Sequence, residues 1–208
     1  AFFWRLSSDR AGSLGGTPLI ILSNQAAQNY ANPSALTIAT RADLPIAVAN
    51  QAEIIAFRNR LDHSENVALI IGKPNDSPPL VRLHSECLTG DVFASLRCDC
   101  GGQLGMALKL IADNGWGILL YLRQEGRSIG LINKLRAYRL QSQGLDTNEA
   151  NQSLGLAVDA RDFNIAAKML ELLGYDNIRL LTNNPAKVEA LTKAGIMISE
   201  RGAHSLDR

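Results

Sequence analysis

The chain has 208 residues, of which 46% are hydrophobic and 20% are charged, and its formal net charge is +1. This length and composition are typical of a soluble globular protein with one large domain, with or without a small extra unit. The near-neutral charge gives no global basic field for nucleic acid, and no apolar run reaches the roughly 18–20 residues of a membrane span. We therefore expect neither a nucleic-acid partner nor a membrane partner.

Residues 1–42 lack the charged, apolar and small-residue order of a signal peptide. The clear apolar run in this segment is TPLIILS (Thr17–Ser23), and ALTIAT (Ala35–Thr40) is a candidate second strand. The segment carries no chemical constellation. We expect it to be a small N-terminal appendage of unknown role.

From Asp43 to Arg208 strand patterns alternate with helix patterns. Strands are predicted at Asn66–Gly72, Leu80–Glu86, Gly117–Gln124, Asn177–Thr182 and Ile196–Ser199. Helices are predicted at Gly102–Gly115, Ile129–Gly144, Thr147–Gly155, Asn164–Gly174 and Asn184–Gly195. Thr147 is expected to cap the short helix that it begins. The alternation predicts an α/β domain over residues 43–208, with a layered mixed β-sheet and flanking helices.

All three cysteines fall in CLTGDVFASLRCDC, with the spacing Cys-x10-Cys-x-Cys. Cys98 and Cys100 can converge on a tight loop, and Cys87 ends a predicted strand. Three thiolates suit zinc, and three protein ligands with an open fourth position are the catalytic arrangement. The alternative is three buried free thiols, since free cysteine is among the most buried residue types. An odd cysteine count makes a reducing cytoplasm the simpler setting.

A fourth protein ligand would make the zinc site structural instead. His84 lies nearest in sequence to the cysteines, and His63 and His204 are further alternatives. Each lone histidine is more often a surface or hydrogen-bonded residue than a ligand.

Three further segments combine basic residues with turns or carboxylates. RQEGRSIGL (Arg123–Leu131) and TNNPAKV (Thr182–Val188) each place a turn and a basic side chain before a helix, which favours anion binding. DARDF (Asp159–Phe163) sets a carboxylate two residues from a guanidinium. Taken singly, these segments are weak signals: most turns of the first kind are solvated loops, the second is compatible with ordinary helix capping, and the third alone favours a surface ion pair. Together with the cysteines they predict a metal-assisted hydrolase acting on a phosphorylated substrate.

A family resemblance extends this prediction. The segments that carry it, in order, are VRLHSECLTGD, SLRCDCG, LYLRQEGRSIGL, NKLRAY, DTNEAN, DARDF and LLTNNPAKVEAL. Over roughly Asp43–Arg201 the chain resembles GTP cyclohydrolase II, the enzyme that opens riboflavin biosynthesis. This family is often fused to a dihydroxybutanone-phosphate synthase, so residues 1–42 can be interpreted as the remnant of a fused domain. The acidic site motif of that synthase is absent, and no second activity is expected.

The resemblance also implies a set of site residues. The zinc ligands correspond to Cys87, Cys98 and Cys100. The GTP-contacting residues correspond to Arg82, His84, Ser85, Glu86, Gln103, Glu125, Gly126, Arg127, Thr147, Thr182 and Lys187. The catalytic residues correspond to Asp159 as proton acceptor, Arg161 as nucleophile and Tyr138 near the base and the metal.

The implied reaction begins with attack of zinc-bound water on C8 of guanine, and a second hydrolysis releases formate. Mg²⁺ on the triphosphate assists loss of pyrophosphate, giving 2,5-diamino-6-ribosylamino-4(3H)-pyrimidinone 5′-phosphate. Because an arginine guanidinium stays protonated, transition-state charge stabilisation is an alternative role for Arg161. Glu149 is a candidate for reading the guanine N1–H and amine. The resemblance further implies a cytoplasmic homodimer.

Two other functions compete with this prediction. One is a relative of the same fold that acts in pyrimidine catabolism, and the other is a catalytically silent nucleotide-binding or zinc-stabilised structural module. The matched site residues, among them the Asp159 and Arg161 pair, argue against both.

Overall fold

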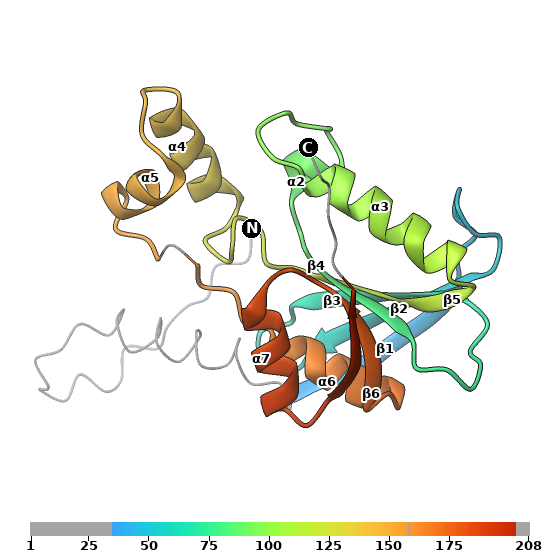
Figure 1. Cartoon of the computed structure of the whole chain (residues 1–208). Coiled ribbons are helices and arrows are strands. Elements are labelled where there is room, and N and C mark those ends of the chain that lie inside the picture. The colour runs from blue at the N-terminus through green and yellow to red at the C-terminus, as the bar shows by residue number, and fades with distance from the viewer. Residues whose placement is uncertain (1–34, 158, 203–208) are drawn as a thin grey trace, which may run out of the picture.

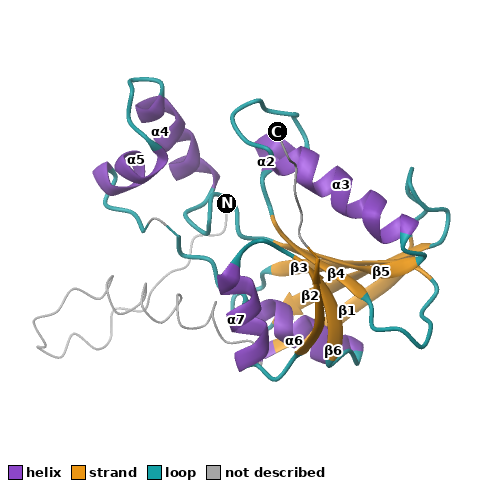
Figure 2. Ribbon diagram, viewed as in Figure 1, coloured by secondary structure: helices purple, strands orange, loops and turns teal. Residues whose placement is uncertain are grey.

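The computed structural model describes residues 35–157 and 159–202, which form one seven-stranded sheet with helices on both faces (Figures 1 and 2). The strands are β1 (Leu36–Asp43), β2 (Ala52–Asn59), β3 (Glu65–Gly72), β4 (Leu80–Ser85), β5 (Trp116–Leu122), β6 (Asn177–Leu181) and β7 (Met197–Gly202). The helices are α2 (Leu88–Asp91), α3 (Cys100–Asp113), α4 (Leu131–Gln141), α5 (Thr147–Ser153), α6 (Asn164–Leu173) and α7 (Pro185–Lys193). None of these helices, within the described ranges, is long and apolar enough to cross a membrane.

The sheet has the strand order β1-β2-β3-β5-β4-β6-β7. Strands β1, β2, β3 and β5 pair antiparallel, whereas β5, β4, β6 and β7 pair parallel. The predicted mixed sheet with flanking helices is therefore confirmed. Each predicted strand and helix between Asn66 and Ser199 is present, with ends that shift by a few residues.

The N-terminal side of the sheet differs from the prediction. Strand β2 was not predicted from the sequence. The candidate strand at Ala35–Thr40 exists as β1, and its pairing with β2 makes it part of the sheet. The sheet therefore begins several residues before Asp43, inside the stretch assigned to the appendage. The other candidate strand, Thr17–Ser23, lies outside the described residues.

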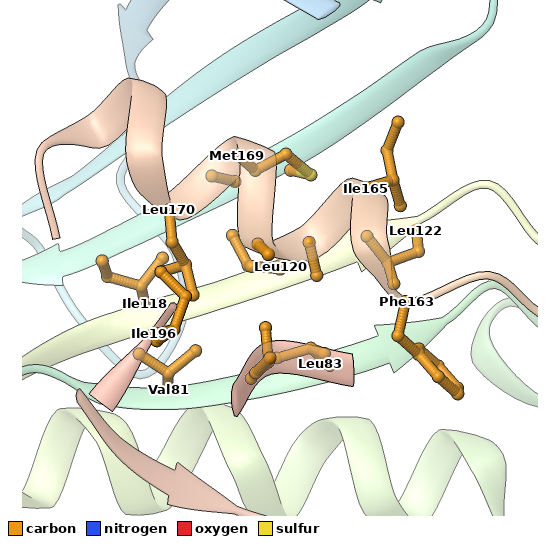
Figure 3. Close-up of a cluster of buried hydrophobic side chains, with 14 of the residues drawn as sticks. Val81, Leu83, Ile118, Leu120, Leu122, Phe163, Ile165, Met169, Leu170 and Ile196 are labelled. Atoms are coloured by element: carbon orange, nitrogen blue, oxygen red, sulfur yellow. The ribbon is translucent and has the colours of Figure 1, made fainter. Parts of the chain in front are cut away.

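Strands β4 and β5 lie in the middle of the sheet with both faces covered. Such strands read as continuous apolar runs, and WGILLYL in β5 is buried at every position except Tyr121. On one face, Val81 and Leu83 of β4 pack with β5 side chains against α6 (Figure 3). Side chains alternate along a strand, so Arg82 and His84 of β4 face the opposite side, toward α2 and α3. Both are nevertheless buried.

The two faces of the sheet carry separate apolar clusters. Helix α6 buries Ala166, Met169 and Leu170 in the larger cluster and ends at Gly174, whose φ of 83° is a left-handed cap. Helix α3 packs Ala107 and Ile111 against the other face. Each fully buried leucine or methionine of this kind contributes roughly 1.5–3 kcal/mol of hydrophobic free energy.

Helices α4 and α5 pack against each other and stand away from the sheet, beside the ends of α2 and α3 (Figure 1). The cap of α5 differs from the prediction. Its N-cap is Asp146, not Thr147, and Asp146 and Glu149 form a reciprocal capping box. An aspartate one residue earlier satisfies the free N–H of Glu149, so Thr147 becomes the first helical residue.

Candidate functional site

The three cysteines come together at the carboxyl end of β4. Cys87 follows the strand and precedes α2, and Cys100 begins α3. Their sulfur atoms all lie within 4.8 Å of one another, and those of Cys87 and Cys98 are 3.6 Å apart. Within the described ranges, this is the group of three or more metal-ligand side chains that the fold assembles. The predicted convergence of the three thiols is present in the structure.

Two glycines make this convergence possible. A Cβ added to Gly90 would lie 2.8 Å from Sγ of Cys98 and 3.2 Å from Sγ of Cys87. A Cβ added to Gly101 would lie 2.2 Å from the carbonyl oxygen of Gly90. Helices α2 and α3 can therefore approach closely, and the thiols can meet, only because both positions lack a side chain.

His84 does not line the cleft and contacts the site through Asp91. Its Nε2 lies 3.0 Å from Oδ1 of Asp91, and because a carboxylate only accepts, Nε2 carries the proton. Asp91 Oδ2 also accepts from the Tyr121 hydroxyl at 2.8 Å and from the Cys87 N–H at 3.0 Å. Burial lowers the pKa of His84. His84 is thus engaged with Asp91 and does not join the thiol group.

The other histidines stand apart from the cysteines. His63 sits in the turn between β2 and β3 and belongs to no group of metal-ligand side chains in the described ranges. His204 lies outside the described residues. The three thiols thus remain without a histidine ligand among the residues described.

Lys134 of α4 contacts Cys87 directly. Its Nζ donates to Sγ of Cys87 at 2.9 Å and to Oε1 of Glu125 at 2.8 Å. Burial opposes the charge on Lys134, but these two partners outweigh it and raise its pKa. Burial likewise opposes the Cys87 thiolate, but hydrogen bonds from Lys134, Thr89 and a backbone N–H lower its pKa. Burial and the negative charge on Cys87 raise the pKa of Cys100.

A cleft of about 490 Å³ opens beside the thiols. It lies between the α2–α3 segment and the α4–α5 pair, at the carboxyl ends of the parallel strands, where α/β folds place ligands. The predicted residues on its wall are Cys87, Cys98, Cys100, Ser85, Glu86, Gln103, Gly126, Arg127, Tyr138, Thr147 and Arg161. The predicted residues outside its lining are Arg82, His84, Glu125, Asp159, Thr182 and Lys187.

A chain of polar contacts leads from β4 to the cleft. Arg82 Nη2 donates to Oε1 of Gln103 at 2.8 Å, and Gln103 Nε2 donates to Oδ2 of Asp99 at 2.7 Å. The Nη1 atom of Arg82 donates to the carbonyl of Leu181 in β6. The Arg82 side chain therefore supports the cleft wall through Gln103 instead of lining it.

Asp159 and Arg161 form an ion pair at the other side of the cleft. Arg161 Nε lies 2.9 Å from Asp159 Oδ1, and its Nη2 lies 2.5 Å from Oδ2. Burial opposes the Asp159 carboxylate, but the hydrogen bonds from Arg161 outweigh this effect and lower its pKa. The guanidinium also lies 5.3 Å from the centre of the Phe163 ring. Arg161 faces the cleft with its geometry fixed by a forked contact.

Lys187 is buried near this ion pair. Its Nζ donates to the carbonyl of Leu83 at 2.7 Å and lies 5.5 Å from the Phe163 ring. Burial, followed by the charges of Arg82 and Arg161, lowers its pKa to about 7. The ammonium therefore sits in an environment that would gain from an added anion.

The remaining predicted residues have local partners. Ser85 lies 3.5 Å from the amide oxygen of Gln124, and Glu86 accepts from Arg123 at 2.8 Å. The Thr182 hydroxyl accepts from the Asn184 N–H at 3.0 Å, and the Thr147 hydroxyl accepts from Gln141 at 3.0 Å. The backbone of Arg127 has a left-handed φ of 58°, so the chain bends sharply before α4.

The carboxylate of Glu149, the candidate for reading guanine, accepts from the Asp146 N–H at 2.8 Å. That contact is one half of the α5 capping box, which gives the side chain a structural role.

Sequence reasoning missed several residues of the site. Lys134 and Asn151 line the cleft, and Asp91 anchors the loop of Cys87. Asn151 is buried, and its Oδ1 has no hydrogen-bond partner among the residues that the structure describes. Lys134 had a readable signal, because it lies four residues before Tyr138 and therefore shares its helix face. Asp91 and Asn151 lie in the family segments VRLHSECLTGD and DTNEAN, but nothing in those segments indicated their roles, since their burial depends on contacts between distant segments.

The fold and the site define an α/β protein in which three thiols converge beside a cleft lined with basic groups. A family model described as GTP cyclohydrolase II matches residues 37–203. The chain is 59% identical over 149 residues to a GTP cyclohydrolase-2 of Enterobacter sp. (strain 638), covering 71% of this chain and 76% of the relative. It is 57% identical over 150 residues to the riboflavin biosynthesis protein RibBA of Bacillus velezensis, covering 71% of this chain and 38% of the relative.

The chain therefore belongs to the GTP cyclohydrolase II family, and it is a hydrolase. The predicted family is confirmed. The match begins at residue 37, within β1, and so includes the strand that extends the sheet before Asp43.

Proposed function

We propose that this enzyme hydrolyses GTP in a zinc-dependent reaction, as the first step of riboflavin biosynthesis. The reaction opens the imidazole ring of guanine and releases formate and pyrophosphate. Its product is 2,5-diamino-6-ribosylamino-4(3H)-pyrimidinone 5′-phosphate. The observation that carries the proposal is the placement of three convergent thiols and of the Arg161 side chain on the wall of one cleft.

The proposed zinc ion would be held by Cys87, Cys98 and Cys100. The donor set fits, since thiolates are preferred zinc ligands and the sulfur atoms lie within 4.8 Å of one another. A site with three protein ligands next to a cleft leaves a position for a small molecule. When bound, zinc supplies Lewis-acid activation of water near neutral pH.

The basic groups of the cleft would bind the triphosphate, which carries Mg²⁺ as part of the substrate. Arg127 and Arg161 line the cleft, and Lys187 lies behind it beside the Asp159–Arg161 pair. Arginine suits phosphate because its donors form a fork. In this proposal, Ser85, Glu86, Gln103, Gly126 and Thr147 contact the nucleotide from the cleft wall, while Arg82, His84 and Thr182 support these groups without lining the cleft.

The catalytic roles fall to three side chains. Tyr138 orients the base near the thiols, since its hydroxyl is 3.2 Å from that of Thr89, which itself lies 3.6 Å from Cys87 Sγ. Asp159 accepts a proton at its carboxylate. Arg161 stabilises the charge that develops on the phosphate oxygens, a role that a protonated guanidinium in a forked ion pair fulfils without activation.

One assay tests the proposal. The full chain is loaded with zinc and incubated with GTP and Mg²⁺, and formate and pyrophosphate are measured. We expect both products in equal amounts. Pyrophosphate without formate would limit the enzyme to phosphate chemistry, and neither product would refute the function.

We further propose a homodimer in the cytoplasm. The support for a dimer is a set of exposed apolar side chains on the loop after α2 and on α4, namely Val92, Phe93, Leu96, Ile132 and Leu135. The support for the cytoplasm is the presence of three free thiols, which a reducing compartment preserves. Light scattering of the full chain measures the mass, and a monomeric mass would refute the dimer.

A further inference from the structure

Lys134 and Glu125 form a largely buried ion pair next to Cys87. The distance between Lys134 Nζ and Glu125 Oε1 is 2.8 Å, and each side chain is only 11% exposed. The same Nζ lies 2.9 Å from Cys87 Sγ. A buried ammonium needs partners that compensate its lost hydration, and these two acceptors supply that compensation.

The oxygens of Glu125 are engaged within the protein. Oε1 accepts from Lys134 and from the N–H of Gly126 at 2.8 Å. Oε2 accepts from the N–H of Leu88 at 2.7 Å, directly after Cys87. One carboxylate therefore joins the loop after β5, the start of α2 and the helix α4. Glu125 is also absent from the cleft lining, which argues against direct contact with a nucleotide.

Charge gives the pair a second role. Three thiolates around a divalent cation leave one net negative charge in a partly buried site. The Lys134–Glu125 pair is neutral overall, but its ammonium lies next to the Cys87 sulfur, where it stabilises the negative charge locally and fixes the sulfur in place. Groups of this kind, which orient metal ligands from behind, are as much a part of a metal site as the ligands themselves.

We propose that Lys134 is a positioning residue for Cys87, held in place by Glu125, so that this ion pair belongs to the metal-binding machinery even though Lys134 lies on the cleft wall. The inference rests on the proposed zinc site and deepens it. It reassigns Glu125 from substrate contact to metal support, and it adds Lys134 to the residues that the site requires.

The first test measures zinc affinity of the full chain by competition with a chelator. We expect Lys134→Met to bind zinc about 10- to 100-fold more weakly than the wild type. Lys134→Arg, which keeps the charge and a donor, should recover part of the loss. The matched control is Lys109→Met, because Lys109 forms an exposed pair with Asp113 on α3, and its zinc affinity should equal that of the wild type. Thermal unfolding of each metal-free variant establishes that it folds.

Cobalt supplies a readout that global stability does not move. Co²⁺ bound to thiolates shows a sulfur-to-metal charge-transfer band, whose energy reports the electron density on the sulfurs. Loss of the Lys134 hydrogen bond to Cys87 should shift this band in Lys134→Met, and the spectrum of Lys109→Met should match that of the wild type. An unshifted band together with unchanged zinc affinity in Lys134→Met would overturn the inference.

Glu125→Gln separates metal support from substrate contact. We expect it to weaken zinc binding, with the KM for GTP of the zinc-saturated variant within about twofold of the wild type. A raised KM with unchanged zinc affinity would assign Glu125 to the nucleotide and overturn the inference. Failure of the wild-type chain to bind zinc would instead refute the proposed function, and the inference with it.

Discussion

Gly90 faces Cys98 so closely that a single methyl group does not fit between them. A Cβ at Gly90 would lie 2.8 Å from the Cys98 sulfur and 2.9 Å from Cβ of Cys100. The backbone of α2 thus forms one wall of the thiol cluster. The position of Cys98 is determined by a residue that contributes no side chain.

This contact predicts that Gly90→Ala impairs metal binding before it impairs folding. The added methyl group must displace Cys98 or Cys100, so zinc affinity should fall by about tenfold or more. The free energy of unfolding of the metal-free chain should fall by about 1–3 kcal/mol, as in other overpacked sites. The matched control is Gly105→Ala in α3, where nothing lies within 4 Å of the added Cβ. Equal zinc affinity in the two variants would show that the thiol cluster is less constrained than the structure indicates.

Lys187 predicts a pH dependence of stability. Its pKa is lowered from 10.5 to about 7 by burial and by the nearby Arg82 and Arg161 charges. Between these two values the unfolded chain holds a proton on Lys187 that the folded chain lacks, so the free energy of unfolding rises with pH. The rise amounts to at most about 1.4 kcal/mol per pH unit. Below about pH 7 the cost of the buried charge is fully present.

Urea unfolding at pH 7 and pH 9 measures this effect. The unfolding free energy at pH 9 minus that at pH 7 should be more positive for the wild type than for Lys187→Met. Lys193→Met, on the exposed end of the same helix, should behave as the wild type does. A wild type and a Lys187→Met variant with the same pH dependence would show that Lys187 stays charged.

The sequence predicted the elements whose patterns are local. Alternation in LVRLHS revealed β4, and Asn184 with Pro185 marked the start of α7 as the structure has it. The three thiols could be predicted to converge because Cys98 and Cys100 are close in sequence and Cys87 ends a strand. Strand β2 carries an equally apolar pattern in AEIIAFRN and escaped prediction.

The contacts of the supporting residues could not be predicted, because they join segments that are far apart in the chain. Asp91 becomes an anchor only when β5 brings the Tyr121 hydroxyl to it. Lys134 reaches Cys87 only through the fold of the segment after β5. The family resemblance implies nucleotide contacts for His84 and Glu125, and local motifs did not reveal their contacts within the protein, with Asp91 for His84 and with Lys134 for Glu125.

The capping box of α5 predicts the behaviour of Glu149. Its carboxylate accepts from the Asp146 N–H, and glutamine can make the same contact. Glu149→Gln should therefore retain discrimination between GTP and ITP, and its unfolding free energy should change by less than about 0.5 kcal/mol. Glu149→Ala, which removes the box, should lose about 0.5–1 kcal/mol. A loss of discrimination in Glu149→Gln, measured as the ratio of the two kcat/KM values, would return Glu149 to the guanine-binding residues.

The forked contact between Arg161 and Asp159 predicts a sharp response to a change that preserves charge. Arg161→Lys keeps the positive charge but cannot reproduce the two parallel hydrogen bonds, so kcat should fall by about 10²–10³-fold. Zinc affinity should not change, since Arg161 touches none of the thiols. The matched control is Arg58→Lys, because Arg58 on β2 forms an exposed ion pair with Glu65 on β3, and this variant should keep full activity.

Arg161 also allows a test that separates charge stabilisation from covalent catalysis. If Arg161 only stabilises charge, rapidly quenched wild-type reactions contain no phosphorylated arginine, and Arg161→Lys retains slow release of formate and pyrophosphate together. We expect this result, because an arginine guanidinium stays protonated in proteins and is thus poorly nucleophilic. Mass spectrometry of the peptide that contains Arg161, quenched under neutral conditions, makes the measurement. A phosphoryl or guanylyl adduct on Arg161 that forms and decays within one turnover would establish covalent catalysis, and the ion pair would then have to break before the chemistry begins.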